Sequence, residues 1–272
     1  MIINPHYILQ KEVCKDISDF VLTNTDFSYT VFSTSEPDWK DNLRRTYSRS
    51  LRTKGIFCSI DVMKFIHQVD LAHLLWIPHN HLNMGIMNWN WYSTIMPNHI
   101  LNSNTIMLPF GKISENKNLI KNTYGNNIFL KPNSPWKPFT GFSTTIDELD
   151  YELNAISQIE KVMNQELVII TDVKEFEPIE YRCWCIEGEV ATSAPYSWQN
   201  ITANVATPSE VLELAKYASD VILGNYINNI VIDIGITPNG PKIIELNSIS
   251  TSGWYTGMDI NALLAAITRN CL

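Results

Sequence analysis

Val231-Ile232-Asp233-Ile234 and Ile243-Ile244-Glu245-Leu246-Asn247 are two apolar runs separated by the turn residues Pro238-Asn239-Gly240, and this pattern predicts a β-hairpin. Each run carries polar groups where a buried strand would have none, and an unpaired buried carboxylate is costly. A divalent cation bridging nucleotide phosphates would pair with them, and Mg²⁺ commonly takes one or two carboxylates plus phosphate oxygens. We therefore expect Asp233, Glu245 and Asn247 to ligate Mg²⁺. A purely structural role for these three side chains is the alternative.

Outward from this hairpin, strand-like runs and amphipathic segments alternate from about residue 106 onward. Two segments begin with capping-box spacing, Thr145 to Glu148 and Thr207 to Glu210, and Glu187-Gly188 joins two extended runs into a second hairpin. We expect strands at residues 127–131, 166–170, 180–186, 189–193, 228–234 and 242–247, and helices at residues 145–163, 207–224 and 259–271. This order favours an α+β fold, with two sheets enclosing a cleft, over a doubly wound parallel sheet.

Composition narrows the class of protein. The 272 residues are 45% hydrophobic, which suffices for a large core, and the net charge of -8 is opposite to that of a general nucleic-acid binder. No uncharged apolar stretch approaches the roughly 18 residues of a membrane span. Five cysteines, an odd number without metal-ligand spacing, favour the reducing cytosol. We expect a cytoplasmic protein without membrane or nucleic-acid partners, and composition leaves its oligomeric state open.

The segment after residue 127 suits phosphate binding. Lys131 ends an apolar run and offers a fixed ammonium, and the loop behind it adds Lys137, Thr140 and the backbone amides around Gly141. The alternative is that a lysine at the end of a strand simply points to solvent.

Two further segments carry polar groups that could bind a nucleoside. Asp172 and Val173 lie in an extended segment whose backbone could pair with the edge of an adenine, unless it is an ordinary linker. Glu180 and Arg182 share one face of the next strand, while Tyr181 and the two following cysteines share the other. Glu180 would hold a ribose hydroxyl and Arg182 would neutralise phosphate oxygens, or the two form a solvated ion pair.

In order and spacing these four pieces resemble the ATP-grasp superfamily over roughly residues 106–260, and the run from Asn127 to Gly141 is most similar to its R-two-K clade of phages and bacteria. The resemblance implies an ATP-grasp fold in which two α+β subdomains, a lid at residues 106–173 and a core at residues 174–272, clamp ATP. Residues 1–105 would form a preceding α/β region that could bind an acceptor. ATP and Mg²⁺ are the implied cofactors. The implied nucleotide-binding residues are Lys131, Lys137, Thr140, Gly141, Asp172, Val173, Glu180 and Arg182; the metal ligands are Asp233, Glu245 and Asn247; and the catalytic residues are Arg182 and Lys137.

The resemblance also implies an activity, an ATP-dependent carboxylate–amine ligase that works through an acyl phosphate on small-molecule or peptide substrates. The loop from Ser248 to Trp254 matches the place where the family holds its acceptor. Gly141 stands alone in a loop that has several glycines in many relatives. Three alternatives stay open: a phosphotransferase, a nucleotide-binding module without turnover, and a metal-binding protein that uses His73, His79, Asn80 and His81.

Two clusters in the first hundred residues have more than one interpretation. Arg44, Arg45, Arg49, Arg52 and Lys54 form a basic cluster, which we interpret as solvated surface or, alternatively, as a site for an anionic acceptor or partner. The aromatic run from Trp89 to Tyr92 is typical of core or interface packing rather than of a stacking platform.

Overall fold

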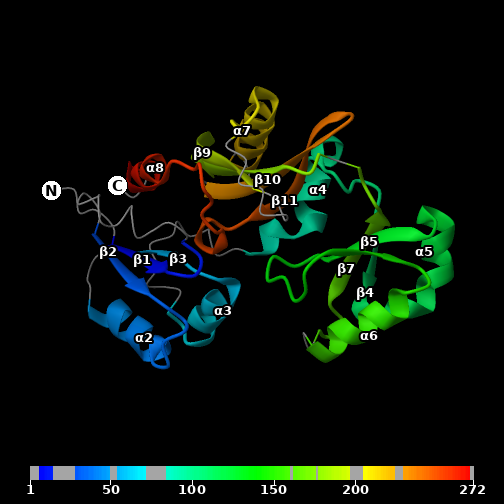
Figure 1. Ribbon diagram of the computed structural model, residues 1–272, viewed down its shortest axis with the longest axis horizontal. Helices are drawn as coiled ribbons and strands as arrows, with labels where there is room; N and C mark the ends of the chain where they lie inside the picture. Colours follow the sequence, from blue (N-terminus) through cyan, green and yellow to red (C-terminus); the bar gives the residue numbers. More distant parts are fainter. Residues whose placement is uncertain are drawn as a thin grey trace.

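The computed structural model describes residues 6–14, 28–49, 54–71, 84–159, 162–175, 177–196, 205–223 and 229–269. Its strands form three sheets, and each sheet carries its own helices (Figure 1). The sheet formed by the C-terminal part of the chain lies between the other two along the longest axis of the molecule. The α+β fold class expected from the sequence is confirmed.

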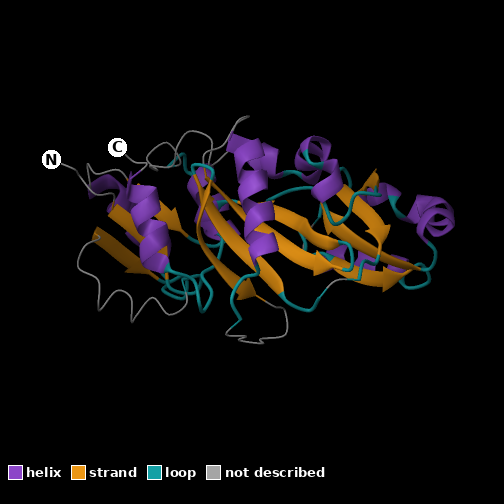
Figure 2. Cartoon of the chain, turned by 90° about the horizontal axis from the view of Figure 1, so that it is seen from above, coloured by secondary structure: helices purple, strands orange, loops and turns teal. Residues whose placement is uncertain are grey.

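The central sheet is antiparallel throughout and has the order β11-β10-β8-β9. Its strands are β8 (Glu180–Ile186), β9 (Glu189–Tyr196), β10 (Asn229–Thr237) and β11 (Gly240–Asn247), so both predicted hairpins are present. Glu187 and Gly188 have φ values of 49° and 82°, the conformation that a two-residue hairpin turn requires. Helix α7 (Ser209–Leu223) lies across this sheet when the molecule is seen from above (Figure 2).

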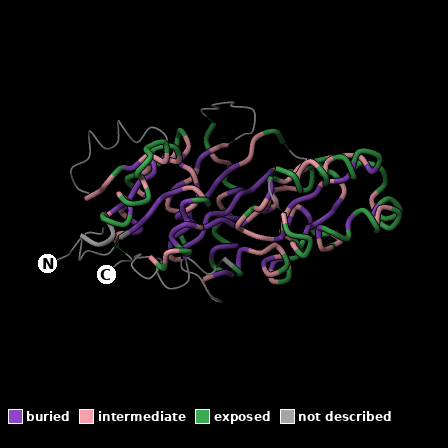
Figure 3. The backbone as a smooth tube through the Cα atoms, turned by 90° about the horizontal axis from the view of Figure 1, so that it is seen from below, coloured by how far each residue is buried: buried purple, intermediate pink, exposed green. Residues whose placement is uncertain are grey.

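Side chains of β8 alternate between the two faces of the central sheet. Tyr181, Cys183 and Cys185 pack with α7 in one hydrophobic cluster, whereas Trp184 and Ile186 pack on the opposite face with α8 (Ile260–Arg269). The buried stretches of the chain follow these central strands (Figure 3). This alternation confirms that the two cysteines lie opposite to Glu180 and Arg182, and both are fully buried free thiols.

The second sheet, which we call the lid sheet, is antiparallel with the order β4-β7-β5-β6. It consists of β4 (Ile106–Pro109), β5 (Asn127–Pro132), β6 (Phe142–Thr145) and β7 (Leu167–Asp172). Helices α5 (Lys117–Tyr124) and α6 (Leu149–Ile159) cover one face, where Ile128 and Leu130 of β5 are buried. Because side chains alternate along a strand, Phe129 and Lys131 point to the other face, toward the central sheet.

The third sheet belongs to the N-terminal region and is parallel, with the order β2-β1-β3. Its elements are β1 (His6–Gln10), β2 (Ser28–Phe32), α2 (Trp39–Arg49), β3 (Lys54–Phe57) and α3 (Ile60–Gln68). One face packs on α2 and α3 and the other on α8, where Tyr7, Leu9 and Phe57 meet Leu263 and Leu264. The N-terminal region is therefore an α/β unit whose core is continuous with that of the C-terminal helix.

Residues 84–100 connect the N-terminal region to the lid sheet but pack with the central sheet. They form η2 (Met84–Met87), α4 (Trp89–Ile95) and η3 (Pro97–His99), and their buried residues join the cluster on the α7 face. Tyr92 is fully buried there, as expected for core packing. Short 3-10 turns also occur at η4 (Phe110–Lys112), η5 (Ser114–Asn116) and η6 (Ile249–Thr251). The boundary at residue 105 stays a prediction.

The sequence misplaced the start of one helix. Residues 145–163 were expected to be helical, but Thr145 ends strand β6 and α6 begins at Leu149. The Thr145 hydroxyl still accepts a hydrogen bond from the Glu148 amide and donates one to its carboxylate. Only half of the predicted capping box therefore forms, one turn before the helix, because the Glu148 carboxylate accepts from the Thr145 hydroxyl rather than from its backbone amide. The strands β4 and β6 have only four residues each, too few for a period to be visible in the sequence.

No helix among the described residues is long and apolar enough to cross a membrane. The expected end of the last helix at Cys271 lies outside the described residues.

Leu264→Ala is expected to lower the free energy of unfolding by about 3 kcal/mol, because it opens a cavity where α8 meets the N-terminal sheet. Leu119 on α5 is 50% exposed, so Leu119→Ala is a matched control that should change stability by less than about 0.5 kcal/mol. Urea unfolding of both variants checks this. If both variants lost the same free energy of unfolding, α8 and the N-terminal sheet would not share a core.

Candidate active site

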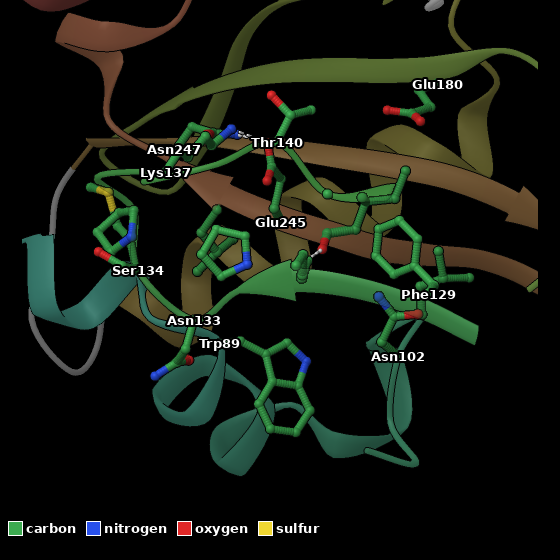
Figure 4. A pocket seen from close by; sticks show the side chains of 18 of the residues that line it. Trp89, Asn102, Phe129, Asn133, Ser134, Lys137, Thr140, Glu180, Glu245 and Asn247 are labelled. Atoms are coloured by element: carbon green, nitrogen blue, oxygen red, sulfur yellow. Dashed lines mark hydrogen bonds and ion pairs between the residues drawn. The ribbon is translucent and has the colours of Figure 1, made fainter. Parts of the chain in front are cut away.

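A cavity of about 620 Å³ lies between the lid sheet and the central sheet. Its walls are β5, the loop at residues 133–141, the connection after β7, and strands β8, β9 and β11, with Ile60 of α3 at one side. Cavities of this size are typical of small-molecule sites. Of the residues expected to bind a nucleotide or metal, those that line the cavity are Lys131, Lys137, Thr140, Gly141, Val173, Glu180, Arg182, Glu245 and Asn247 (Figure 4).

Asp233 and Asp172 are the two expected site residues that do not line this cavity. Asp233 is fully buried behind Arg182. Asp172 forms an ion pair with Lys174 at 2.7 Å and accepts a hydrogen bond from the Thr171 hydroxyl. Burial alone would raise the pKa of Asp172, but the Lys174 ammonium outweighs it and lowers that pKa. Asp172 therefore lies outside the cavity wall, whereas its neighbours Val173 and Lys174 line the cavity. A role of Asp172 at an adenine stays a prediction.

Arg182 and Asp233 form a bidentate ion pair between β8 and β10. The guanidinium Nε donates to Asp233 Oδ1 and Nη2 donates to Asp233 Oδ2, each at 2.7 Å. The two residues are direct partners in the strand register, which explains why they meet. Burial disfavours the charge on Arg182, but Asp233 outweighs this and raises the pKa of the guanidinium, so Arg182 stays charged.

Two tyrosines hold the outer side of the Arg182 guanidinium. Its Nη1 donates to the Tyr255 hydroxyl at 3.2 Å, and its central carbon lies 4.8 Å from the Tyr196 ring centre and 5.1 Å from the Tyr255 ring centre. Stacking on aromatic faces attracts a guanidinium and fixes its plane. Both tyrosines line the cavity, and the sequence analysis missed them because nothing local relates them to Arg182.

Glu245 and Asn247 form the second polar group of the site. Lys137 Nζ lies 2.6 Å from Glu245 Oε1, and Asn247 Nδ2 donates to both Glu245 and Asp233. Burial raises the pKa of Glu245, but the ammonium groups of Lys137 and Lys131 outweigh it and hold that pKa at about 2. The protein's own cations therefore pair with these carboxylates. This corrects the sequence argument that only a nucleotide-bound cation could do so.

A β-bulge positions Lys131 against β11. The register between β10 and β11 shifts after Asp233, which pairs with Glu245, and the next pair joins Ile234 to Ile243. Ile244 is thus the extra residue, and a bulge leaves such a residue outside the ladder. Lys131, which is only 9% exposed, donates from Nζ to the Ile244 carbonyl at 2.9 Å. Burial lowers the pKa of Lys131, and the nearby Glu245 carboxylate opposes that shift.

Gly141 brings the loop at residues 133–141 against β5. A Cβ atom at this position would lie 2.9 Å from the Phe129 ring, 3.1 Å from Lys131 Cβ and 3.3 Å from the Leu130 carbonyl oxygen. Only glycine fits this approach without moving the strand. Lys137, at the middle of the same loop, has a φ of 43°, an uncommon value for a residue with a side chain. The loop is therefore shaped to bring Lys137 over Glu245.

Glu180 is an acid whose pKa lies in the neutral range. Burial, followed by the nearby Asp233 carboxylate, raises the pKa of Glu180 to about 7. Glu180 lines the cavity on the side opposite to Lys137 and Asn247 (Figure 4). It is therefore poised to take a hydrogen-bond donor, such as a hydroxyl, that would stabilise its ionised form.

The acid and amide oxygens fit a magnesium ion. Glu245 and Asn247 face the cavity, and Asp233 lies directly behind them. Oδ1 of Asp233 accepts a single hydrogen bond from the described residues, so a lone pair remains. A carboxylate and an amide oxygen at the cavity wall, with a second carboxylate held behind them by Arg182, suit Mg²⁺ when phosphates complete its coordination.

The remaining sequence candidates lie elsewhere or outside the described residues. Arg44 and Arg45 are exposed on α2 and pair with acidic residues of the same region, and neither lines the cavity. The described part of the structure does not include the side chains of Arg49, Arg52 and Lys54. It also does not include the segment from His73 to His81. Within the expected acceptor loop, Thr251 and Gly253 line the cavity.

Known proteins resemble this chain in sequence profile and in structure. Residues 110–267 match the family described as ATP-grasp domain, R-two-K clade family 3. No curated protein matches the chain in sequence. The solved structure of D-cycloserine synthetase DcsG is 10% identical with a TM-score of 0.68, over 99% of this chain and 100% of that one.

Two other solved structures extend the comparison. D-alanine–D-alanine ligase from Bacillus anthracis complexed with ATP is 14% identical with a TM-score of 0.58, over 99% of this chain and 97% of that one. ATP-grasp ligase PsnB complexed with minimal precursor, Mg and ADP is 11% identical with a TM-score of 0.53, over 100% and 99%. At these identities the likeness establishes the ATP-grasp fold. Together with the family match over more than half of its length, it shows that the chain belongs to the ATP-grasp domain family of the R-two-K clade, family 3.

Proposed function

We propose that this protein is an ATP-dependent carboxylate–amine ligase. The observation that carries the proposal is the convergence of three cationic and two acidic side chains on one cavity between two sheets: Lys131, Lys137, Arg182, Glu180 and Glu245. The family match supports ATP as the substrate, and the structural neighbours, named as ligases or synthetases, support the joining reaction. Four free, buried cysteines fit a reducing location such as the cytosol.

The reaction consists of two transfers. An oxygen of the substrate carboxylate attacks the γ-phosphorus of ATP, the bond to the ADP oxygen breaks, and an acyl phosphate forms. The nitrogen of an amine then attacks the acyl carbon, phosphate leaves with the bonding electrons, and the amine loses a proton. Lys131, Lys137 and Arg182 stabilise the negative charge that grows on the transferred phosphoryl group. No protein nucleophile takes part, so positioning and charge are what the chain supplies.

Glu245, Asn247 and Asp233 would hold Mg²⁺. When bound, the ion neutralises phosphate charge and draws electrons from the transferred group. The residues around this set fix the positions of the donors: Arg182 holds Asp233, and Asn247 bridges Asp233 and Glu245. Lys137 is paired with Glu245 here, and it is close enough to serve the phosphates instead.

Glu180 and the connection after β7 would bind the nucleoside. A carboxylate accepts hydrogen bonds from both ribose hydroxyls, and Val173 and Lys174 follow directly after β7 at the same side of the cavity. The acceptor carboxylate would lie toward Thr251, Gly253 and Ile60, where the N-terminal region closes the cavity. The nucleoside and the acceptor carboxylate would thus contact different walls of the cavity.

A phosphotransferase or a nucleotide-binding module without turnover is distinguished by product analysis. A ligase forms ADP only slowly until both a carboxylate and an amine are present, whereas a phosphotransferase needs no amine. A binding module binds ATP and forms no ADP under any condition. ADP release measured with a panel of amino acids and dipeptides as carboxylates, with and without an added amine, separates the three.

Glu245→Gln is expected to lower ADP formation by about 100-fold or more, because it removes a metal-binding charge at nearly constant volume. Glu189→Gln is a matched control, since Glu189 also pairs with a lysine at 2.7 Å but is 75% exposed. Binding of ATP should lose its dependence on Mg²⁺ in Glu245→Gln alone, as measured by calorimetry at several Mg²⁺ concentrations. Wild-type ADP release from Glu245→Gln would contradict the assignment of the site.

The ATP affinity of the wild type relative to Glu180→Gln is expected to rise by about fivefold between pH 6 and pH 8. The sign follows from the pKa of about 7 for Glu180, because the carboxyl is neutral below that pH and ionised above it. An ionised acceptor makes the stronger hydrogen bond to a hydroxyl. Phosphate titration affects both proteins equally and cancels in the ratio. A ratio that does not change with pH would remove Glu180 from the ribose site.

A further inference from the structure

The side chain of Asn102 is a buried polar group that none of the described residues satisfies. Asn102 is 4% exposed and lines the cavity, yet its carboxamide makes no hydrogen bond with any residue that the structure describes. Among the described residues, the Thr105 hydroxyl donates a hydrogen bond to the backbone carbonyl of Asn102 at 3.4 Å. Because Asn102 lines the cavity, its carboxamide is available to a ligand bound there.

The backbone around Asn102 is held by both sheets. On one side the Leu101 amide donates to the Ile243 carbonyl of β11 at 2.9 Å, beside the bridge between Ile100 and Ile243. On the other side the Thr171 hydroxyl of β7 donates to the Asn104 carbonyl at 2.9 Å. Residues 100–104 therefore span the junction of the lid and central sheets. The backbone around Asn102 is therefore hydrogen-bonded to a strand of each sheet.

This junction is the end of the cavity that suits a flat ring. Phe129, Leu246 and Ile244 line the cavity with apolar surface, and Val173 and Lys174 follow β7 directly. In Figure 4, Asn102 and Phe129 lie at one side of the cavity, whereas Lys137 and Asn247 lie at the other. Lys137 and the Asn102 carboxamide are thus at opposite sides of the cavity, with the Phe129 ring beside Asn102. A nucleotide bound with its phosphates at Lys137 places its base toward Asn102.

We propose that the Asn102 carboxamide recognises the nucleobase, accepting from the N6 amino group of adenine and donating to the ring nitrogen beside it. The proposal rests on the proposed use of ATP by this site. An amide presents one acceptor and one donor side by side, and adenine presents the complementary pair. In the amide orientation that fits adenine, the O6 acceptor of guanine would face the amide oxygen, whichever ring nitrogen lies beside it. Asn102 thereby makes the enzyme selective for ATP over GTP.

The test measures nucleotide binding by calorimetry in the full chain, with ATP, with purine riboside triphosphate, which lacks the N6 amino group, and with 7-deaza-ATP. Wild type should prefer ATP over purine riboside triphosphate by about 10-fold. Asn102→Leu, which keeps the shape but has no polar atoms, should bind both equally. If the wild type but not the variant binds 7-deaza-ATP more weakly than ATP, the ring nitrogen is N7. If the wild type binds both with equal affinity, it is N1. Asn122→Leu on the exposed face of α5 is the matched control and should keep the full preference.

A second variant keeps the inference testable if Asn102→Leu does not fold. Asn102→Asp replaces the donor by a second acceptor, and guanine presents two adjacent donors at N1 and the 2-amino group. The preference of the wild type for ATP over GTP should therefore fall by about 10-fold or more in Asn102→Asp. If ATP binds but the variants keep the wild-type preferences, Asn102 does not recognise the base and the ligase proposal stands. If the wild type binds no nucleotide at all, the ligase proposal fails and this inference fails with it.

Discussion

The bidentate ion pair between Arg182 and Asp233 is the interaction on which the rest of the site depends. Two charges have been taken out of water between neighbouring strands, and such a pair is tolerated only with near-ideal geometry and further hydrogen bonds. Here Asn247 and Tyr255 supply those bonds, and two tyrosine rings cover the guanidinium. Removing one partner would leave a buried, unpaired charge, which typically costs several kcal/mol. The pair fixes Arg182 at the cavity wall through contacts within the protein itself.

Two lysines connect the lid sheet to this buried network. Lys131 reaches the carbonyl that the β11 bulge leaves outside the ladder, and Lys137 reaches Glu245 from the loop above. The same ammonium groups are the ones a triphosphate would attract. Their contacts to the central sheet keep the carboxylates neutralised before a nucleotide arrives. Under the proposed function, a bound triphosphate would exchange one set of ion pairs for another.

The N-terminal region contributes a wall rather than a separate module. Its parallel sheet packs on α8, the Cys58 amide donates to the Ser250 carbonyl, and Ile60 at the start of α3 lines the cavity. One wall of the cavity, the one we propose for the acceptor, thus lies where the first and last parts of the chain meet. In the described part of the chain, the basic residues of α2 lie away from the cavity and pair with nearby acids.

The sequence by itself determined the alternation of faces along each strand, both C-terminal hairpins, the fold class and most of the polar residues that line the cavity. These follow from local periodicity, because a charge within an apolar strand is visible without knowing its neighbours. It left Asp233 without a protein partner, which the structure corrected, whereas the expected place of Asp172 at an adenine stays a prediction. Only the tertiary structure decided that Arg182 meets Asp233 across 51 residues, that Tyr196 and Tyr255 stack on it, and that Asn102 is buried where two sheets join. Such contacts depend on strand order and register between distant segments, and no local pattern in a single sequence encodes them.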